Sequence, residues 1–598
     1  MESQGSETDM CELSRRKSVF SGESNATGSV SIDRLGHGGH MTRPLATAIV
    51  SFAILFLVSL TVSGGEFNAS VDAGAEMDIA DGEVLDLDLQ RAYEIALARN
   101  LDLQVGRYDL AIADTGIQGA SGIFDPSFDL GAESSYNESP AATQLDGAVV
   151  TETRNTQYNL GLGGLMPTGG TASIGLGTRR TATNSQFYFL NPSWGTGLTA
   201  RLNQPLLRNF GTLVTRSRIV VAQTNRDQAA ETLKTQVIAT LQQVEQAYWD
   251  FAAAKVLVDV KLQSLELAQK LLKETKERIR VGTSAPIDLV QSEASVATRN
   301  QDLILARNAQ ANSEDALKQV LGFQTPAEWA MKIIAAEPYV FEPLDVDLAS
   351  SIETALKERP EIIRQEMSLD ITNLNVKLAR NAVLPSLDLT GSYGFSGIGG
   401  TLSFDDPITG EPSRIKGGFD DSLDQIVDMD YPNWGVGLAL KVPLGNNDAK
   451  ANLARRRFEH HQTETRLSAL QQSITHDVRV AVRYLYDGAA SVEAAEASKV
   501  LAERNVEAEQ TKFANGLSTN FLVLQIQDDL ANAQLSNLRA RLYYRKAIVG
   551  YRVATGTLLD ELGVDIADAG APEEDHTLWK DVKWMQFVDF RGDDESEE

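Results

Sequence analysis

Apolar residues recur with a helical period over a very long stretch of the chain, residues 216–280. These 65 residues include neither proline nor glycine, and one continuous helix of that length would extend about 100 Å at ~1.5 Å per residue. Twelve steps between apolar positions cover 42 residues, a mean spacing of 3.5, through Val237, Leu241, Val244, Tyr248, Phe251, Ala254, Val258, Leu262, Leu265, Ala268, Leu272, Thr275 and Ile279. A period of about 3.5 predicts the seam of a left-handed coiled coil.

A turn signal follows this helix directly. Gly282 is suited to the residue just after a helix end, Ser284 can cap the next helix, and Pro286 fits the first turn of that helix. We therefore expect the chain to reverse here and to continue as a second helix, Ile287 to Leu321.

The same design returns later in the chain. Gly516 and Gly556 stand 234 residues after Gly282 and Gly322, respectively (516 − 282 and 556 − 322). A second seam with a mean spacing of 3.5 precedes Gly516, through Leu467, Leu470, Ile474, Val478, Ala481, Leu485, Ala489, Val492 and Ala495. Two helical hairpins of equal length are predicted, one in each half of the chain.

Each hairpin is preceded by a helix and a β region. Helices are predicted over 89–119 and 348–381, and Pro126-Ser127 corresponds to Pro385-Ser386 at an offset of 259 (385 − 126). Apolar and polar positions alternate at Phe128, Leu130, Ala132 and Tyr136; at Leu198, Ala200 and Leu202; at Leu387, Leu389, Tyr393 and Phe395; and at Trp434, Val436, Leu438, Leu440 and Val442. This pattern fits a membrane barrel and a half-buried soluble sheet equally well.

The strand count bears on this choice. Each half offers two strands, and residues 158–165 and 171–177 add a pair to the first half if Pro167-Thr168-Gly169-Gly170 is a turn. Four to six strands are fewer than the roughly eight that a barrel needs. Any barrel must therefore be shared between chains. The segments 137–155 and 397–431 are expected to be long loops.

Composition excludes some classes of function. The formal net charge of −28 argues against nucleic acid as a partner; it fits solvated helix faces or an acidic lumen. The apolar run 48–62, preceded by Arg43 and followed by small residues, is typical of a signal peptide cleaved near Gly64, with an N-terminal anchor as the alternative. Cys11, the one cysteine, precedes that run, so the mature chain would have no disulfide.

No catalytic, metal or cofactor site is predicted. His460 and His461 are helix neighbours that point about 100° apart, which disfavours shared metal ligation. The glycine clusters at 161–164 and 175–177 match neither a P-loop nor a dinucleotide fingerprint. The protein is therefore not expected to be an enzyme.

The tandem repeat, the strand ends Gln204-Pro205-Leu206-Leu207 and Val442-Pro443-Leu444-Gly445, and the turns at 280–284 and 514–518 resemble the TolC family. These are outer-membrane efflux proteins of Gram-negative bacteria, and the resemblance covers residues 89–556. It implies a homotrimer with a β-barrel in outer-membrane lipid and a coiled-coil α-barrel across the periplasm. It also implies a periplasmic adaptor (membrane fusion) protein and an inner-membrane transporter of the RND, ABC or MFS type as partners.

The resemblance also implies site residues. The adaptor-docking tips correspond to Val281, Gly282 and Thr283 and to Asn515, Gly516 and Leu517. The periplasmic gate corresponds to Asp288, Gln291, Leu522 and Gln525. Asp288 is equally well explained as an acidic residue in the first turn of a helix. Because Leu522 and Gln525 stand where well-studied members carry aspartates, the resemblance does not extend to a double acidic ring.

We therefore predict six segments: an N-terminal extension with signal peptide (1–64), a lead (65–88), the first repeat (89–322), a linker (323–347), the second repeat (348–556) and an acidic tail (557–598). The first β region exceeds the second by 21 residues (79 between prolines against 58). We expect this excess to be a surface hairpin, which gives twelve barrel strands in a trimer rather than 18. The predicted function is an exit duct for efflux or type I secretion; the alternatives are a non-enzymatic coiled-coil scaffold and an uptake porin.

Overall fold

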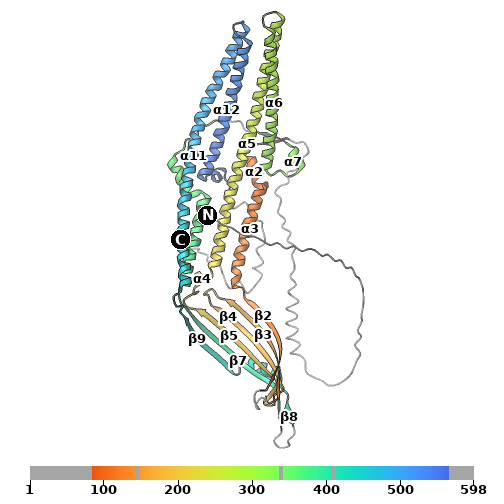
Figure 1. Ribbon diagram of the computed structural model, residues 1–598, viewed down its shortest axis with the longest axis vertical. Helices are drawn as coiled ribbons and strands as arrows, with labels where there is room; N and C mark the ends of the chain where they lie inside the picture. The colour runs from red at the N-terminus through yellow and green to blue at the C-terminus, as the bar shows by residue number, and fades with distance from the viewer. Residues whose placement is uncertain (1–83, 142–146, 336–340, 406–411, 565–598) are drawn as a thin grey trace, which may run out of the picture. The chain divides into compact units, whose positions relative to one another are not determined.

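The computed structural model describes residues 84–141, 147–335, 341–405 and 412–564, all within a unit that spans Asp72–Glu598 (Figure 1). The predicted signal peptide and most of the acidic tail lie outside the described residues. The helices are α2 (Leu89–Arg99), α3 (Leu101–Ser121), η1 (Gly122–Phe124), α4 (Thr212–Thr215), α5 (Ser217–Arg280), α6 (Pro286–Val320), α7 (Pro326–Ala330), α8 (Leu348–Glu358), α9 (Pro360–Ala382), α10 (Phe419–Val427), α11 (Asn447–Ala514), α12 (Asn520–Thr555) and α13 (Leu558–Leu562).

The two helical hairpins are confirmed. Helices α5 and α6 have 64 and 35 residues, and α11 and α12 have 68 and 36. The predicted seams are buried at most of their positions: Leu241, Val244 and Tyr248 are fully inaccessible, as is Val478 on α11. Leu262 departs from the expectation because 39% of its surface is exposed.

Each half begins with two helices rather than the single helix expected there. Helices α2 and α3 meet at Asn100, whose side chain caps the second helix. Helices α8 and α9 meet at Arg359, which precedes proline and so disfavours helical backbone. Asn100 and Arg359 are 259 residues apart, the same offset as between the two β regions. The continuous helices expected over 89–119 and 348–381 are therefore wrong in the same way, and the internal repeat extends to the break.

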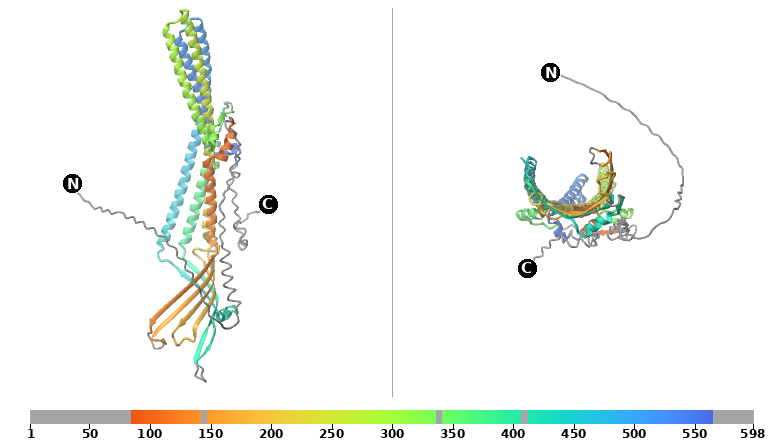
Figure 2. Two further views of the ribbon diagram at one scale, coloured as in Figure 1. Left: turned by 90° about the vertical axis from the view of Figure 1, so that its right-hand side faces the viewer. Right: turned by 90° about the horizontal axis from the view of Figure 1, so that it is seen from below.

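One sheet of seven strands holds all the long strands, in the order β2-β3-β4-β5-β7, with β9 and the short β8 both on the far side of β7. All six pairings are antiparallel, and the sheet curves as an open trough (Figure 2). The strands are β2 (Ser127–Pro140), β3 (Val150–Leu165), β4 (Thr171–Thr183), β5 (Leu190–Pro205), β7 (Ser386–Asp405), β8 (Pro412–Ile415) and β9 (Pro432–Lys441).

The pair β3 and β4 corrects two expectations. These strands lie inside the main sheet between β2 and β5, joined by the turn at Pro167-Thr168-Gly169-Gly170, and do not form a separate surface hairpin. Each chain therefore has six long strands in one sheet rather than four, so the expected surface hairpin, on which the preference for twelve strands in a trimer rested, is wrong. The segments 137–155 and 397–431 are not wholly loops either, because they include strand ends, β8 and α10.

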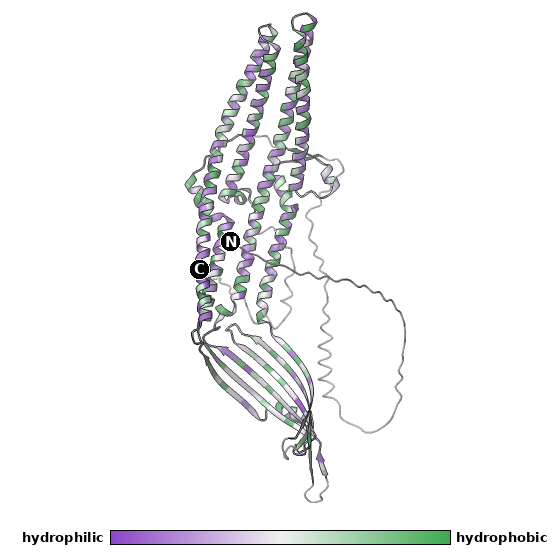
Figure 3. Cartoon of the chain, viewed as in Figure 1, coloured by the Kyte–Doolittle hydropathy of each residue, from purple (hydrophilic) through white to green (hydrophobic). Residues whose placement is uncertain are grey.

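Register places apolar residues in rows across one face of the sheet. One row contains Phe128, Leu162, Ile174, Ala200, Tyr393 and Trp434, one residue from each long strand. Phe128 is 65% exposed and Trp434 is 74% exposed, so the described residues leave this row of the apolar face uncovered. The neighbouring positions along each strand, such as Asp129 and Asn433, belong to the opposite, mainly polar face, and the alternation is visible in Figure 3. An apolar outer face of this kind is suited to lipid.

Helix α10 covers part of that face, against β5 and β7 and toward the ends of these strands that are remote from the long helices (Figure 2). The Ser422 and Thr196 hydroxyls are hydrogen bonded at 2.8 Å, and a Cβ added at Gly397 would lie 2.0 Å from the Ser422 carbonyl oxygen. Glycine at residue 397 is therefore required for α10 to pack this closely.

The segments around the repeats are also folded. Strand β1 (Val84–Leu87) in the lead pairs in parallel with β6 (Lys332–Ala335) in the expected linker. In the same linker, α7 carries Glu328, which is paired with Arg99. Leu558, at the start of the expected acidic tail, is fully buried in the main core. The apolar residues of these segments are part of the same hydrophobic core as the middle of α5. No described helix is both long and apolar enough for a membrane crossing.

Candidate functional site

The two hairpin tips have the same backbone geometry. Gly282 and Gly516 adopt φ angles of 81° and 74°, which only glycine reaches without strain. The N–H of the residue after each glycine donates to the carbonyl five residues earlier, at 2.8 Å in the first tip and 2.9 Å in the second. This bond satisfies a carbonyl that the helix end would leave free.

The predicted docking residues are accessible at these tips. All six, Val281, Gly282, Thr283, Asn515, Gly516 and Leu517, are exposed. Val281 and Leu517 are apolar yet 64% and 79% exposed, so each tip presents an uncovered apolar side chain.

Asp288 caps the first turn of α6. Its carboxylate accepts a hydrogen bond from the Ala285 backbone N–H at 3.2 Å, which is the local role expected of an acidic residue there. Gln291, Leu522 and Gln525 are exposed in the first two turns of α6 and α12. Their assignment to a gate stays a prediction.

A buried polar cluster lies directly behind these residues. Thr275 from α5, Ser292 from α6 and Asn520 from α12 are each at most 3% exposed. The Asn520 side chain accepts from the Thr275 hydroxyl at 3.2 Å and donates to the Ser292 hydroxyl at 3.1 Å and to the Asp288 carbonyl at 3.3 Å. This cluster joins the second hairpin to both helices of the first.

Two arginines join the same hairpins on either side of the cluster. Nearer the tips, the Arg278 guanidinium donates to the Phe513 carbonyl at 2.5 Å and lies 4.1 Å from the centre of the Phe513 ring. Farther from the tips, Arg299 of α6 donates to the Ser264 carbonyl at 3.0 Å and to Asp528 of α12 at 2.8 Å. Burial lowers the pKa of Arg299, and the Asp528 carboxylate opposes that effect.

We call these contacts the hairpin ties: Arg278 with Phe513, Asn520 with Thr275 and Ser292, and Arg299 with Asp528. They were not predicted from the sequence. One signal was available, because Thr275 is a polar residue at a position of the apolar seam.

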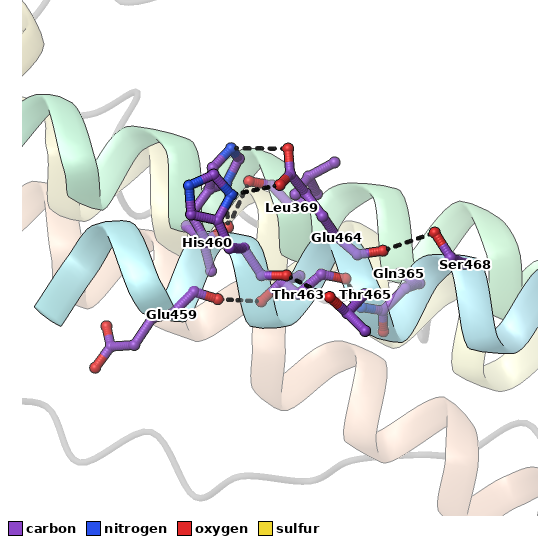
Figure 4. Close-up of polar contacts among 10 residues, drawn as sticks. Gln365, Leu369, Glu459, His460, Thr463, Glu464, Thr465 and Ser468 are labelled. Carbon is purple, nitrogen blue, oxygen red and sulfur yellow. Dashed lines mark hydrogen bonds and ion pairs between the residues drawn. The ribbon is translucent and has the colours of Figure 1, made fainter.

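The adjacent histidines lie far from the tips, where α11 packs on α9. His461 Nδ1 and His460 Nε2 lie 2.8 and 3.5 Å from the two oxygens of Glu464, and His460 Nδ1 also lies 3.2 Å from the Thr372 hydroxyl of α9 (Figure 4). The hydrogen bond with His461 lowers the pKa of Glu464. Although the two histidines are adjacent on a helix, they share one carboxylate. Across the described ranges no group of three or more His, Cys, Asp or Glu side chains could hold a metal ion.

The chain is similar to known export proteins. Residues 170–323 and 351–557 match a family model described as outer membrane efflux protein. Outer membrane protein TolC of Vibrio cholerae is 25% identical over 331 residues, which cover 55% of this chain and 69% of that protein. Outer membrane efflux protein BepC of Brucella suis is 24% identical over 392 residues, 64% of this chain and 77% of that protein. The Campylobacter jejuni CmeC outer membrane channel shares the fold, with a TM-score of 0.56, 16% identity, and coverage of 81% of this chain and 91% of that one.

Proposed function

The chain belongs to the outer membrane efflux protein family, and from that premise we propose that three copies assemble into one export duct through the outer membrane and the periplasm. The sheet spans the outer membrane and the two hairpins extend into the periplasm. The duct provides a passive exit, and it has no catalytic role.

One observation carries this proposal: an open sheet with six long strands and a largely uncovered apolar face continues directly into two helical hairpins of nearly equal length. A coiled-coil scaffold would not need the sheet, and an uptake porin would not need helices of 64 and 68 residues. A duct needs both parts.

The proposed partners act at the tips. The exposed Val281 and Leu517 offer a periplasmic adaptor an apolar contact on each hairpin, and an inner-membrane transporter would supply cargo through that adaptor. The hairpin ties lie immediately behind this surface. A partner that separates the hairpins must break them, so docking and opening would be coupled.

Deletion followed by a panel of toxic compounds tests the function. Loss of an exporter should sensitise the cells, with rescue by the intact gene, whereas loss of an uptake porin should protect them. An unheated detergent sample should migrate as a trimer on a gel. A stable monomer with native strand content would contradict the proposal.

A further inference from the structure

The sheet ends in two edges that have no partner in the described part of the chain. Strand β2 pairs only with β3, and over its ten residues β9 pairs only with β7. Unpaired backbone N–H and C=O groups are strongly unfavourable in lipid, so both edges must be paired after insertion. The trimer of the proposed function supplies the partner, since β9 runs inward and β2 runs outward and the two can pair antiparallel.

Three copies with six long strands each give a barrel of 18 strands. A path that follows the hydrogen bonds from strand to strand once around a barrel does not return to the residue at which it began. It reaches the starting strand a fixed number of residues away, and this number is the shear of the barrel. Threefold symmetry divides that displacement into three equal shifts, one at each junction between copies. Each shift must be even, because an odd shift would exchange the apolar and polar faces.

Strand tilt limits the shift to two values. With a rise of about 3.4 Å per residue and a strand spacing of about 4.8 Å, shifts of 4, 6, 8 and 10 residues correspond to tilts of about 25°, 35°, 43° and 50°. Membrane barrels have tilts of about 35–45°. Only shifts of about six or eight residues fit that range.

The position of β2 in the chain fixes the direction of the shift. Within one chain, the row that begins at Phe128 ends at Trp434. A shift toward lower numbers would place the partner of Trp434 before Ser127, where β2 begins. Trp434 must therefore lie opposite either Ser134 or Tyr136 of the partner subunit.

We propose the eight-residue shift, in which Lys441 lies opposite Asp129 of the partner subunit and Trp434 opposite Tyr136 of the partner subunit. Within the described residues, neither Lys441 nor Asp129 forms an ion pair. Opposite charges and aromatic pairs directly across strands are favourable. The six-residue shift would instead place Lys441 opposite Ser127 and Trp434 opposite Ser134, and both pairings would be lost.

The occupant of each edge is therefore a second copy of this chain, in a defined register. All ten residues of β9 would lie opposite residues 129–138 of β2, within the 14 residues of that strand. Each strand occupies about 6.6 Å of the circumference at a tilt of about 43°, which gives the barrel backbone a radius of about 19 Å.

Engineered cysteines test the register in the full-length protein. The parent carries Cys11→Ser, which removes the one native cysteine. Asn433→Cys is combined with Asn137→Cys for the eight-residue shift and with Ser135→Cys for the six-residue shift. In the wrong register the two Cα atoms would be about 8 Å apart, beyond the range of about 4.4–6.8 Å for a disulfide.

The pair with Asn137→Cys should form a disulfide-linked trimer that survives heating in detergent and is lost on reduction. Strands β2 and β9 of one chain are separated by four other strands, so the bond can form only between copies. A second pair at another height, Lys441→Cys with Asp129→Cys, should behave in the same way.

Every other outcome overturns the proposed register. Cross-linking of Asn433→Cys with Ser135→Cys would establish the six-residue shift. No cross-link in either pair, with the unheated trimer intact, would exclude closure by β9 and β2 but would leave the trimer in place. Absence of a trimer in the parent would overturn the proposed function together with the register.

Discussion

Replacing Asp528 by asparagine should release one of the hairpin ties and favour the open tip. In the structure, the Arg299 side chain is 6% exposed, and its 2.8 Å contact with Asp528 joins α6 to α12. Asp528→Asn keeps the size of the side chain and removes the charge. Arg299 retains its bonds to Ser264, so the first hairpin should stay intact while its attachment to the second weakens.

The magnitude follows from the exposure of the two groups. A hydrogen bond between charged groups contributes about 1.5–3 kcal/mol. Asp528 is 67% exposed, and solvent screening reduces the contribution to about 1 kcal/mol. Three copies that open together would change the balance by about 3 kcal/mol, which corresponds to an increase of about 10²-fold in the ratio of open to closed channels.

Single-channel recording in planar bilayers measures this ratio. Glu293→Gln is the matched control, because Glu293 is paired with Lys276 at 3.4 Å within the first hairpin and does not connect the hairpins. The control should conduct like the wild type, and Asp528→Asn should spend far longer in a high-conductance state. Equal open times for all three proteins would refute the view that these ties hold the tip closed.

Three further predictions concern other parts of the helical region. Gly282→Val and Gly516→Val should each cost about 1–2 kcal/mol, and because there is open space around each added Cβ, this cost is backbone strain from the positive φ angle and not a steric clash. Trimers should still form while resistance to toxic compounds is lost. Normal resistance in both variants would exclude the tips as the docking surface. Asp288→Asn should weaken the block of conductance by trivalent cations and Gln525→Asp should strengthen it, whereas undiminished block in Asp288→Asn would assign the acidic ring to other residues. Burial raises the pKa of Glu328, but hydrogen bonds from two backbone N–H groups and Arg99 outweigh this and lower the pKa to about 2. The resulting stabilisation of about 3 kcal/mol is complete above about pH 4.5 and is lost toward about pH 2. Urea unfolding of Glu328→Gln should therefore show lower stability at pH 7 and a weaker dependence of stability on pH between about pH 4.5 and about pH 2, and an unchanged pH dependence would contradict this prediction.

The helical hairpins could be predicted from the sequence because their signals are long and repeated. The 3.5-residue seam returns before the second turn and the glycine turns recur at a constant offset, and such repetition is rare by chance. The breaks at Asn100 and Arg359 were missed because a cap or a single proline changes the backbone without interrupting the apolar pattern.

The strand count was harder to predict for a physical reason. Strand β3 has glycine at 161, 163 and 164, so its alternation is weak by itself and becomes clear only when Leu160 and Leu162 align with apolar residues of β2 and β4. The hairpin ties were missed because Arg299 and Asn520 are polar side chains whose burial depends on a helix more than 200 residues away. The spacing of apolar residues within one segment does not reveal how that segment pairs with, or is buried by, a segment far away in the sequence.

The open sheet also determines the order in which the duct can be built. In the proposed trimer, a pair of chains would close one junction and still expose two strand edges, as many as a single chain exposes. The third chain closes two junctions at once and leaves none, so nearly all the gain from sealing the ring comes in the last step. Assemblies of two chains should therefore be short-lived, and the number of complete ducts should depend steeply on how many chains reach the membrane at the same time. Until then each chain exposes strand edges that invite aggregation, and the cell must keep the chains apart before insertion.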